Sequence, residues 1–187
     1  MKLNHIQQFE LRVGPKKKLD FIKEVFDVCE MAQSFIFVNT KDFAEKIHEW
    51  LRKAGYKSYI MFSKMSKEER DKTIQQFRAG EINVLITTNL VARGIDVPEV
   101  DLVINYDVPQ TREGNQNVGD PETYLHRIGR TGRFGKQGVA LSIYDRDQDK
   151  EYLDQILAHY KMEDMMNVLE GPDHLKRVLE EIVDKQQ

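Results

Sequence analysis

The sequence predicts an α/β protein in which helices cover both faces of a mainly parallel sheet. Short apolar runs alternate with stretches of helical periodicity along the chain, a pattern typical of stacked βαβ units. The length of 187 residues is close to the roughly 150 residues expected of one domain. Neither an internal repeat nor a low-complexity tract interrupts the pattern. We therefore expect residues 1–187 to form a single domain.

The first half of the chain begins with a weakly alternating stretch that indicates a strand near the edge of the sheet. The elements expected there are a strand at 5–13, a helix at 16–30, and strands at 34–40 and 56–62. Between the last two strands, Thr40 can cap a helix that Gly55 ends. The residues spaced to form the core face of this helix are Phe43, Ala44, Ile47, Leu51 and Ala54. Phe35 and Phe37 alternate within a buried strand, so we expect them in the core.

The second half begins with a capping box. Ser66 and Glu69 are placed to open a helix that carries Ile74 and Phe77 and stops at Gly80. The elements that follow are strands at 83–88 and 102–105, a polar loop at 110–120, a short helix from about 122, a strand at 139–144, and helices at about 148–160 and 172–185. A Gly-Pro pair separates the last two helices.

Composition and patterning point away from a membrane or secreted protein. No apolar run approaches the ~18–20 residues that span a bilayer, and the first residues lack the apolar core of a signal peptide. The single cysteine, Cys29, cannot form an internal disulfide, which suits a reducing compartment. We therefore expect an intracellular protein with no membrane partner.

The distribution of charge is more informative than the net charge of −3. Between Thr123 and Tyr144 there is no acidic residue, and the basic residues of this stretch are Arg127, Arg130, Arg133 and Lys136, with His126 beside them. Such a stretch either directs positive charge at one anionic target or forms a solvated basic loop. Charge alone does not decide between these alternatives.

The geometry of open parallel sheets predicts where ligands bind. They bind beyond the carboxyl ends of the strands. The residues that the predicted strands place there are Asn39, Thr40, Ser63, Thr87, Thr88 and Asn89. We expect the glycine–arginine cluster that begins at His126 to join them.

The string HRIGRTGRFG (126–135) indicates a phosphate site. Gly129 and Gly132 remove side-chain bulk, which allows a tight turn and the close approach of a phosphate. Arg130 and Arg133 are three residues apart, so on one helical face they could reach the same ligand. Guanidinium groups fork onto phosphate oxygens, and an arginine placed against a γ-phosphate accelerates its transfer by ~10³–10⁵. The alternative is a surface turn with incidental arginines.

The same string resembles motif VI of the DEAD-box RNA helicases. VLITTNLVARGIDVP (84–98) resembles their motif V, SFIFVNTK (34–41) is similar to motif IV, and ERDKTIQQFRAG (69–80) is similar to the stretch that follows it. These motifs follow the family's order and spacing over about residues 34–140. The resemblance implies a RecA-like three-layer α/β/α sandwich that forms the C-terminal half of an ATP-dependent RNA helicase.

For ATP, the resemblance implies that Arg130 and Arg133 are arginine fingers that contact the phosphates and act in catalysis. Asp96 would accept hydrogen bonds from the ribose hydroxyls, although an aspartate at this position could also cap a loop. Gly94 would let the backbone come close to the nucleotide.

Other positions are carried over to RNA and to a second domain. The RNA-binding residues implied are Asn39, Arg70, Thr88 and Arg93, which would hold the backbone without reading sequence. Thr88 could instead cap its strand, and Arg70 could be a solvated helix charge. His126 and Arg127 would bridge to an N-terminal RecA-like domain when the cleft closes, although His126 could equally be a surface histidine with satisfied hydrogen bonds.

Local features narrow the resemblance to the branch of the family that remodels messenger ribonucleoprotein during messenger-RNA export at the nuclear pore. TTN (87–89) replaces the family's common Thr-Asp, TREGNQNVGDPETYLHR (111–127) is longer than usual, and IQQFEL (6–11) fits that branch too. The resemblance implies a location in cytoplasm and nucleus and an export-activating protein partner. In fungi that partner binds with inositol hexakisphosphate, which the acidic last helix disfavours here through Glu180, Glu181 and Asp184.

The sequence contains neither G-x-x-x-x-G-K-[ST] nor D-E-A-D. We therefore expect the implied cofactors, ATP and Mg²⁺, to require an N-terminal ATP-cradling domain that is absent from this chain, and we assign no metal ligand within it. The chain is then either half of an ATPase that clamps RNA or a non-catalytic docking module for a partner protein. The combination of Arg130, Arg133 and Asp96 favours the ATPase, because a docking module does not need them.

Overall fold

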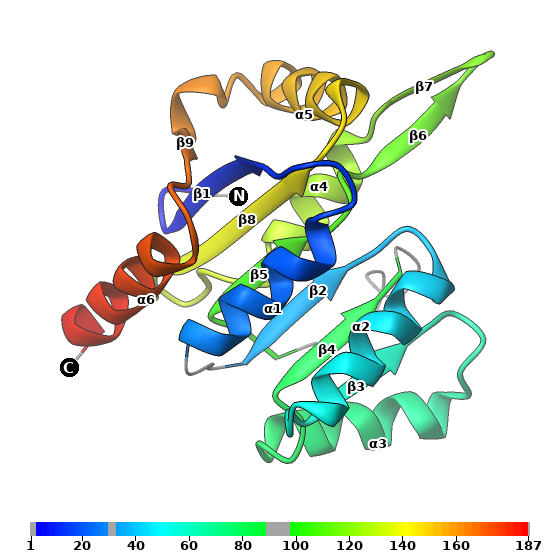
Figure 1. Cartoon of the computed structure of the whole chain (residues 1–187), viewed down its shortest axis with the longest axis vertical. Coiled ribbons are helices and arrows are strands. Elements are labelled where there is room, and N and C mark those ends of the chain that lie inside the picture. Colours follow the sequence, from blue (N-terminus) through cyan, green and yellow to red (C-terminus); the bar gives the residue numbers. More distant parts are fainter. Residues whose placement is uncertain (1–2, 30–32, 89–97, 187) are drawn as a thin grey trace.

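The computed structural model describes residues 3–29, 33–88 and 98–186 (Figure 1). The strands of the main sheet are β1 (Ile6–Arg12), β2 (Ser34–Phe37), β3 (Ser58–Met61), β4 (Val84–Thr87), β5 (Leu102–Asn105), β8 (Gly138–Tyr144) and β9 (Met166–Val168). The helices are α1 (Lys18–Val28), α2 (Lys41–Lys53), α3 (Lys67–Arg78), α4 (Pro121–Ile128), α5 (Asp147–Tyr160) and α6 (Pro172–Gln186).

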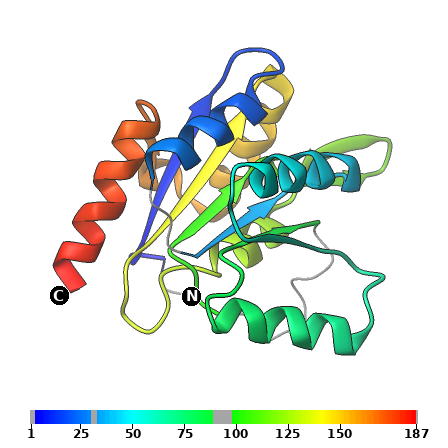
Figure 2. The ribbon, with the colours of Figure 1, turned by 60° about the horizontal axis from the view of Figure 1, so that its bottom comes forward.

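The seven strands form one sheet in the order β3-β4-β2-β5-β8-β1-β9, and every neighbouring pair is parallel. Helices α1, α2 and α6 pack on one face, and α3, α4 and α5 pack on the other. Figure 2 shows α1 and α2 on one side of the strands and α3 on the opposite side. The predicted α/β class is confirmed. Within the described part of the chain, no helix is long and apolar enough to cross a membrane.

Strand β2 shows how the sequence produces this sandwich. Ile36 belongs to the core cluster beneath α1 and α2, whereas its neighbours Phe35 and Phe37 belong to the cluster beneath α3. Both phenylalanines are 3% exposed, as predicted, and their ring centroids lie 5.9 Å apart. A strand covered on both faces favours apolar residues on both, which explains the continuous apolar run from Phe35 to Val38.

The helix caps predicted at Thr40 and at Ser66 are confirmed. The N–H of Glu69 donates to Ser66 Oγ at 3.1 Å, and the N–H of Ser66 donates back to Glu69 Oε2 at 2.9 Å. The N–H of Phe43 donates to Thr40 Oγ1 at 3.4 Å. These bonds satisfy amide groups that the first turn of a helix leaves without partners.

The predicted core face of α2 is wrong at both ends. Ala44, Ile47 and Leu51 are fully buried, but Phe43 is 43% exposed and Ala54 is exposed. Phe43 lies one position, or about 100°, around the helix from the buried stripe, and its ring packs beside Tyr106 at the end of β5. Ala54 follows the last turn of the helix as its C-cap.

The segment predicted as a polar loop at 110–120 is an antiparallel hairpin. Strands β6 (Gln110–Glu113) and β7 (Gln116–Gly119) pair with each other and project beyond the end of the main sheet (Figure 1). Their two-residue turn places Gly114 first, at φ +59°, as a type II′ hairpin favours. At the base, the N–H of Gly119 donates to Gln155 Oε1 at 2.8 Å, and a Cβ on this glycine would overlap the carbonyl oxygen of Tyr152.

A short 3-10 helix, η2 (Glu163–Met165), and strand β9 lie between α5 and α6, where the sequence indicates no element. Strand β9 pairs with β1 through three residues at the edge of the sheet. The stretch is too short to show a periodicity. The strand predicted near the edge at 5–13 therefore lies one position inside it.

Candidate functional site

Two of the residues predicted to bind RNA, Asn39 and Thr88, lie at the carboxyl ends of neighbouring strands. Asn39 follows β2 and Thr88 follows β4, while Ser63 follows β3 beside them, and we call this stretch of the sheet the carboxyl edge. Asn39 is exposed, and its backbone N–H donates to Asp107 Oδ2 at 2.7 Å. Arg70 is half-buried in the first turn of α3. The structure thus groups the ends of these strands, and the contacts of Asn39, Arg70 and Thr88 with RNA remain predictions.

The two predicted arginine fingers lie beyond the end of α4, in residues 129–137, which we call the arginine loop. Helix α4 ends at Ile128 and Gly129 is its C-cap. The spacing of Arg130 and Arg133 suggests that they share a helical face. They do not, because the helix ends before either of them. A turn, not a helix, sets their relative position.

The arginine loop lies at the amino ends of the strands. The N–H of Val100, which precedes β5, donates to the carbonyl of Arg130 at 3.0 Å. The N–H of Gly138, the first residue of β8, donates to the carbonyl of His5, which precedes β1, at 2.8 Å. The prediction that this cluster joins the carboxyl-edge residues is wrong. The reason is α4, which starts beyond the carboxyl end of β5 and returns the chain to the start of β8.

The arginine loop brings two positive charges together. The backbone N–H of Arg133 donates to Glu99 Oε1 at 2.6 Å, and its Nε donates to the carbonyl of Gly129 at 2.7 Å. Burial, and after it the charge of Arg133, lower the pKa of Arg130. An anion bound between two neighbouring guanidinium groups favours their charged forms. The local electrostatics therefore suit a phosphate.

Close packing at the amino ends of the strands requires glycine at two positions. Gly132 has φ +67°, and a Cβ there would lie 2.7 Å from Ile6 Cγ1 and 3.0 Å from the carbonyl oxygen of His5. A Cβ on Gly138 would overlap Thr131 Oγ1. The sequence suggests that Gly132 makes room for a phosphate. In the structure the space beside it is filled by the start of β1, so its role is to let the loop pack there.

Phe134 is the most exposed of the large apolar side chains in the described residues, at 92%, and its φ is +54°. A bulky residue is strained in this region, whereas asparagine tolerates it. We expect Phe134→Asn to raise the free energy of unfolding of this chain by roughly 0.5–1 kcal/mol, measured by urea denaturation. Phe134→Leu, which keeps the strain, should give no such gain. A loss of stability in the asparagine variant would contradict the strain argument.

Arg127 faces the core of its own domain. Its side chain is fully buried, and its Nη1 donates to the carbonyl of Asp107 at 2.7 Å and to Asn105 Oδ1 at 3.2 Å. The guanidinium also lies 5.1 Å from the ring centroid of Phe37. Burial lowers the pKa of Arg127, while the charges of Asp107 and Asp120 raise it. The prediction that Arg127 bridges to another domain is wrong, because this side chain instead fixes α4 to the end of β5.

The remaining predicted residues divide into two groups. His126 is half-buried on α4, and its role between domains stays a prediction. Arg93, Gly94 and Asp96 lie within 89–97, outside the described residues.

Sequence reasoning missed a polar network beneath the carboxyl edge. Asp107 Oδ1 lies 3.2 Å from Lys18 Nζ, and the two side chains are 18% and 10% exposed. Asn105 Nδ2 donates to Ser142 Oγ at 3.1 Å in the buried interior. A signal was present, because Asp107 follows β5 as Asn39 follows β2, and polar residues after parallel strands are the ones that face ligands.

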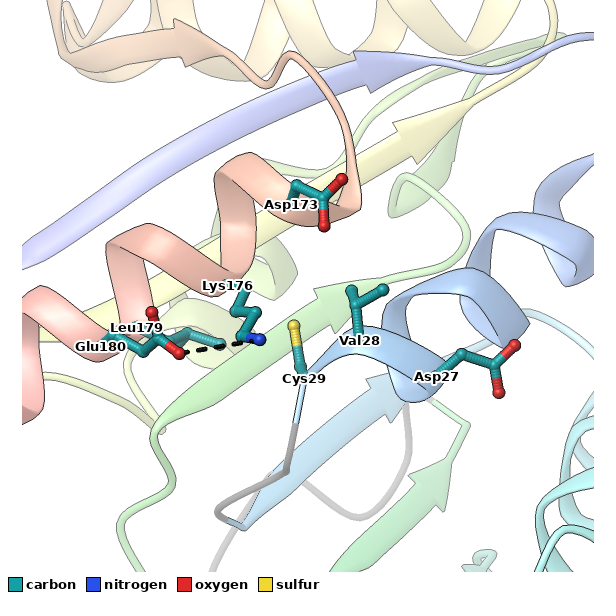
Figure 3. Close-up of a pocket in the computed structure, with 7 residues that line it drawn as sticks. All are labelled: Asp27, Val28, Cys29, Asp173, Lys176, Leu179 and Glu180. Carbon is teal, nitrogen blue, oxygen red and sulfur yellow. Dashed lines mark ion pairs between the residues drawn. The ribbon is translucent and has the colours of Figure 1, made fainter.

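A cavity of about 690 Å³ lies between the end of α1 and helix α6 (Figure 3). It is lined by Asp27, Val28, Cys29, Asp173, Lys176, Leu179 and Glu180. Lys176 Nζ and Glu180 Oε1 lie 3.9 Å apart along one wall, and burial raises the pKa of Cys29 to about 11. No residue predicted to bind ATP or RNA lines this cavity.

Comparison with known proteins identifies the family. Residues 17–135 match the model of the helicase conserved C-terminal domain. The ATP-dependent RNA helicase DBP5 of Meyerozyma guilliermondii is 38% identical over 171 residues, which cover 91% of this chain and 35% of that protein. The solved C-terminal domain of the DEAD-box protein Dbp5 is 35% identical, with a TM-score of 0.85, over 96% of this chain and 99% of that one.

Dbp5 of Saccharomyces cerevisiae has been solved in complexes that match this chain closely. In the complex with RNA and ADP BeF3 it is 34% identical with a TM-score of 0.84, over 96% of this chain and 46% of that one. Its L327V form, bound to Nup159, Gle1 H337R, IP6 and ADP, is 33% identical with a TM-score of 0.82, over 98% of this chain and 47% of that one.

The chain spans about a third of the length of the curated relatives that it matches, since it covers 35% of the Meyerozyma protein. The match reaches nearly the whole of the solved Dbp5 C-terminal domain and reproduces its RecA-like fold. The domain model and the fold agree on one assignment. The chain belongs to the helicase conserved C-terminal domain family, among the RecA-like C-terminal domains of DEAD-box helicases related to Dbp5.

Proposed function

We propose that this chain is the C-terminal half of an ATP-dependent RNA helicase that supplies arginine fingers for ATP hydrolysis. The observation that supports this most directly is the arginine loop, in which burial and, after it, the charge of Arg133 lower the pKa of Arg130. Backbone and side-chain bonds hold Arg133 in place without using its terminal nitrogens. A docking module without chemistry would gain nothing from keeping two such charges together.

In this proposal the nucleotide binds between the arginine loop and an N-terminal ATP-cradling domain. Arg130 and Arg133 contact its phosphates, Asp96 accepts from the ribose hydroxyls, and Gly94 lets the backbone approach. No group of three or more His, Cys, Asp or Glu side chains suited to a metal occurs among the described residues, and the guanidinium groups repel cations. We therefore assign Mg²⁺ mainly to the nucleotide phosphates and the ATP-cradling domain. His126 would bridge the two domains when the cleft closes.

RNA binds at the carboxyl edge in this proposal. Asn39, Arg70, Thr88 and Arg93 would contact its phosphates and sugars, which allows binding without sequence preference. The exposure of Asn39 at the end of β2 supports this placement. The arginines that would contact the ATP phosphates and the RNA site would then lie at opposite ends of the strands.

The proposed biological setting is ribonucleoprotein remodelling during messenger-RNA export, in the cytoplasm and nucleus and at the nuclear pore. The support is the similarity to S. cerevisiae Dbp5, which has been solved with Nup159, Gle1 and IP6. We propose an export-activating protein as partner. Inositol hexakisphosphate is less well supported, because α6 carries Glu180, Glu181 and Asp184, and its Lys176 lies 3.9 Å from Glu180.

A turnover measurement tests the central claim. Residues 1–187 alone should show no appreciable RNA-stimulated ATP hydrolysis, because the triphosphate cradle is missing. The two-domain enzyme, by which we mean a polypeptide with an ATP-cradling domain before this chain, should show it. Phosphate release is measured for both proteins with and without single-stranded RNA. Robust hydrolysis by residues 1–187 alone, or none by the two-domain enzyme, would contradict the proposal.

A further inference from the structure

The two proposed ligand sites lie at opposite edges of the sheet, so RNA-dependent hydrolysis needs a connection between them. The described residues contain a route that runs through the interior. It begins at Asp107, the residue that occupies the space between the end of β5 and the turn at Asn39.

Asp107 is bonded in three directions. Its Oδ2 accepts from the backbone N–H of Asn39 at 2.7 Å, and its Oδ1 lies 3.2 Å from Lys18 Nζ. Its carbonyl oxygen accepts from Arg127 Nη1 at 2.7 Å. Lys18 also lies 5.4 Å from the ring centroid of Tyr106, which fixes the ammonium group beside the carboxylate. Because both charged side chains are largely buried, the geometry of this pair is closely constrained.

The route continues from Asp107 to the arginine loop along α4. Arg127 lies in the last turn of α4, and its carbonyl accepts from the N–H of Arg130 at 3.2 Å. Three hydrogen bonds thus lead from the exposed turn at Asn39 to the backbone of Arg130. A displacement of the Asn39 turn cannot occur without changing the bond to Asp107 or moving Asp107 with it.

We propose that Asp107 is a positioning residue that transmits the state of the RNA-facing turn at Asn39 to the arginine loop through Arg127. This rests on the proposed function, because it takes Asn39 as an RNA contact and Arg130 as a finger. Asp107 touches neither ligand. Asp107 affects the degree to which RNA stimulates ATP hydrolysis, whereas Arg130 and Arg133 act directly on the phosphates.

Two matched double variants separate positioning from a merely structural role. Lys18→Gln with Asp107→Asn removes both charges but keeps an amide oxygen to accept from Asn39 and an amide group to bond Gln at position 18. Lys18→Gln with Asp107→Ala removes the charges and the acceptor as well. The two proteins therefore differ by the bond that the proposal requires, while the ion pair is absent from both.

Hydrogen exchange on residues 1–187 tests the connection without requiring catalysis. In the alanine double variant we expect amide exchange to rise at least tenfold both at Asn39 and in the arginine loop, whereas the asparagine double variant should keep both protected. Circular dichroism confirms that both fold. If exchange rises at Asn39 but stays unchanged in the arginine loop, or if both variants lose protection equally, the proposal is overturned.

RNA-stimulated hydrolysis in the two-domain enzyme provides the functional readout. We expect the ratio of RNA-stimulated to RNA-free turnover to stay within about twofold of wild type in the asparagine double variant and to fall about tenfold in the alanine double variant. Equal ratios in the two variants would overturn the role of Asp107. Absence of stimulation in the wild-type two-domain enzyme would instead contradict the proposed function, while the exchange measurement would still decide on the connection.

Discussion

Replacing Arg130 or Arg133 with alanine in the two-domain enzyme is expected to lower kcat by roughly 10²–10⁴. Negative charge spreads over the γ-phosphate during its transfer, and a guanidinium group that contacts it acts chiefly on that developing charge. The loss therefore falls on kcat rather than on binding of ATP. Each single loss should stay below the full effect of an arginine finger, because two arginines share the task. Steady-state ATP hydrolysis with saturating RNA measures the change.

Lys136→Ala is the matched control for this pair, because Lys136 is an exposed basic residue in the same loop. An exposed charge contributes little, so this variant should hydrolyse ATP at nearly the wild-type rate. Circular dichroism must show unchanged folding in all three variants. If both arginine variants keep the wild-type kcat, the arginine-finger assignment fails and the basic stretch is an anion-facing surface without a catalytic task.

Arg127→Ala should have the largest effect on stability, lowering the free energy of unfolding of this chain by about 3–5 kcal/mol. The substitution removes hydrogen bonds to the carbonyl of Asp107 and to Asn105 Oδ1, and it leaves a cavity beside Phe37. Buried acceptors that lose a charged donor regain no bond to water. Urea denaturation of residues 1–187 measures the change.

Arg112→Ala in the exposed hairpin is the control, and we expect a change within about 0.5 kcal/mol. The comparison also tests the corrected assignment of Arg127. A protein with Arg127→Ala that unfolds at the same urea concentration as wild type would mean that the buried network is unimportant for the fold. The earlier interpretation, a bridge to a second domain, would then deserve renewed testing.

The fold was predictable where burial imposes a periodic pattern. Strand β2 is covered on both faces and is apolar after Ser34, and the stripe of Ala44, Ile47 and Leu51 marks the buried face of α2. The hairpin β6–β7 was not predictable in this way, because most of its side chains are polar and exposed. Its strands are specified by the turn at Gly114 and by contact with α5. Neither feature produces a periodic pattern of apolar residues in the sequence.

The site was predictable in its residue types but not in its placement. The string from His126 to Gly135 identifies Arg130 and Arg133, yet it does not tell at which end of the strands they lie. Their position depends on α4, which returns the chain to the amino ends of the strands before Arg130 and Arg133. The direction of a single side chain is equally hidden, so Arg127 could be assigned to a surface although it is fully buried. Asp107 belongs to no quoted motif and emerges from the structure.

The position of β1 in the sheet has a consequence for how the chain folds during synthesis. Ile6 pairs with Gly138, 132 positions later (138 − 6), and the other neighbour of β1 is β9, which is later still. Closing a loop of this length costs conformational entropy before any contact compensates it, and such pairings slow folding. Within residues 1–187, β1 is therefore synthesised before the other strands but is among the last to find its partners. Until β8 emerges, β1 is an unpaired strand whose backbone groups are open to chaperones or to other nascent chains.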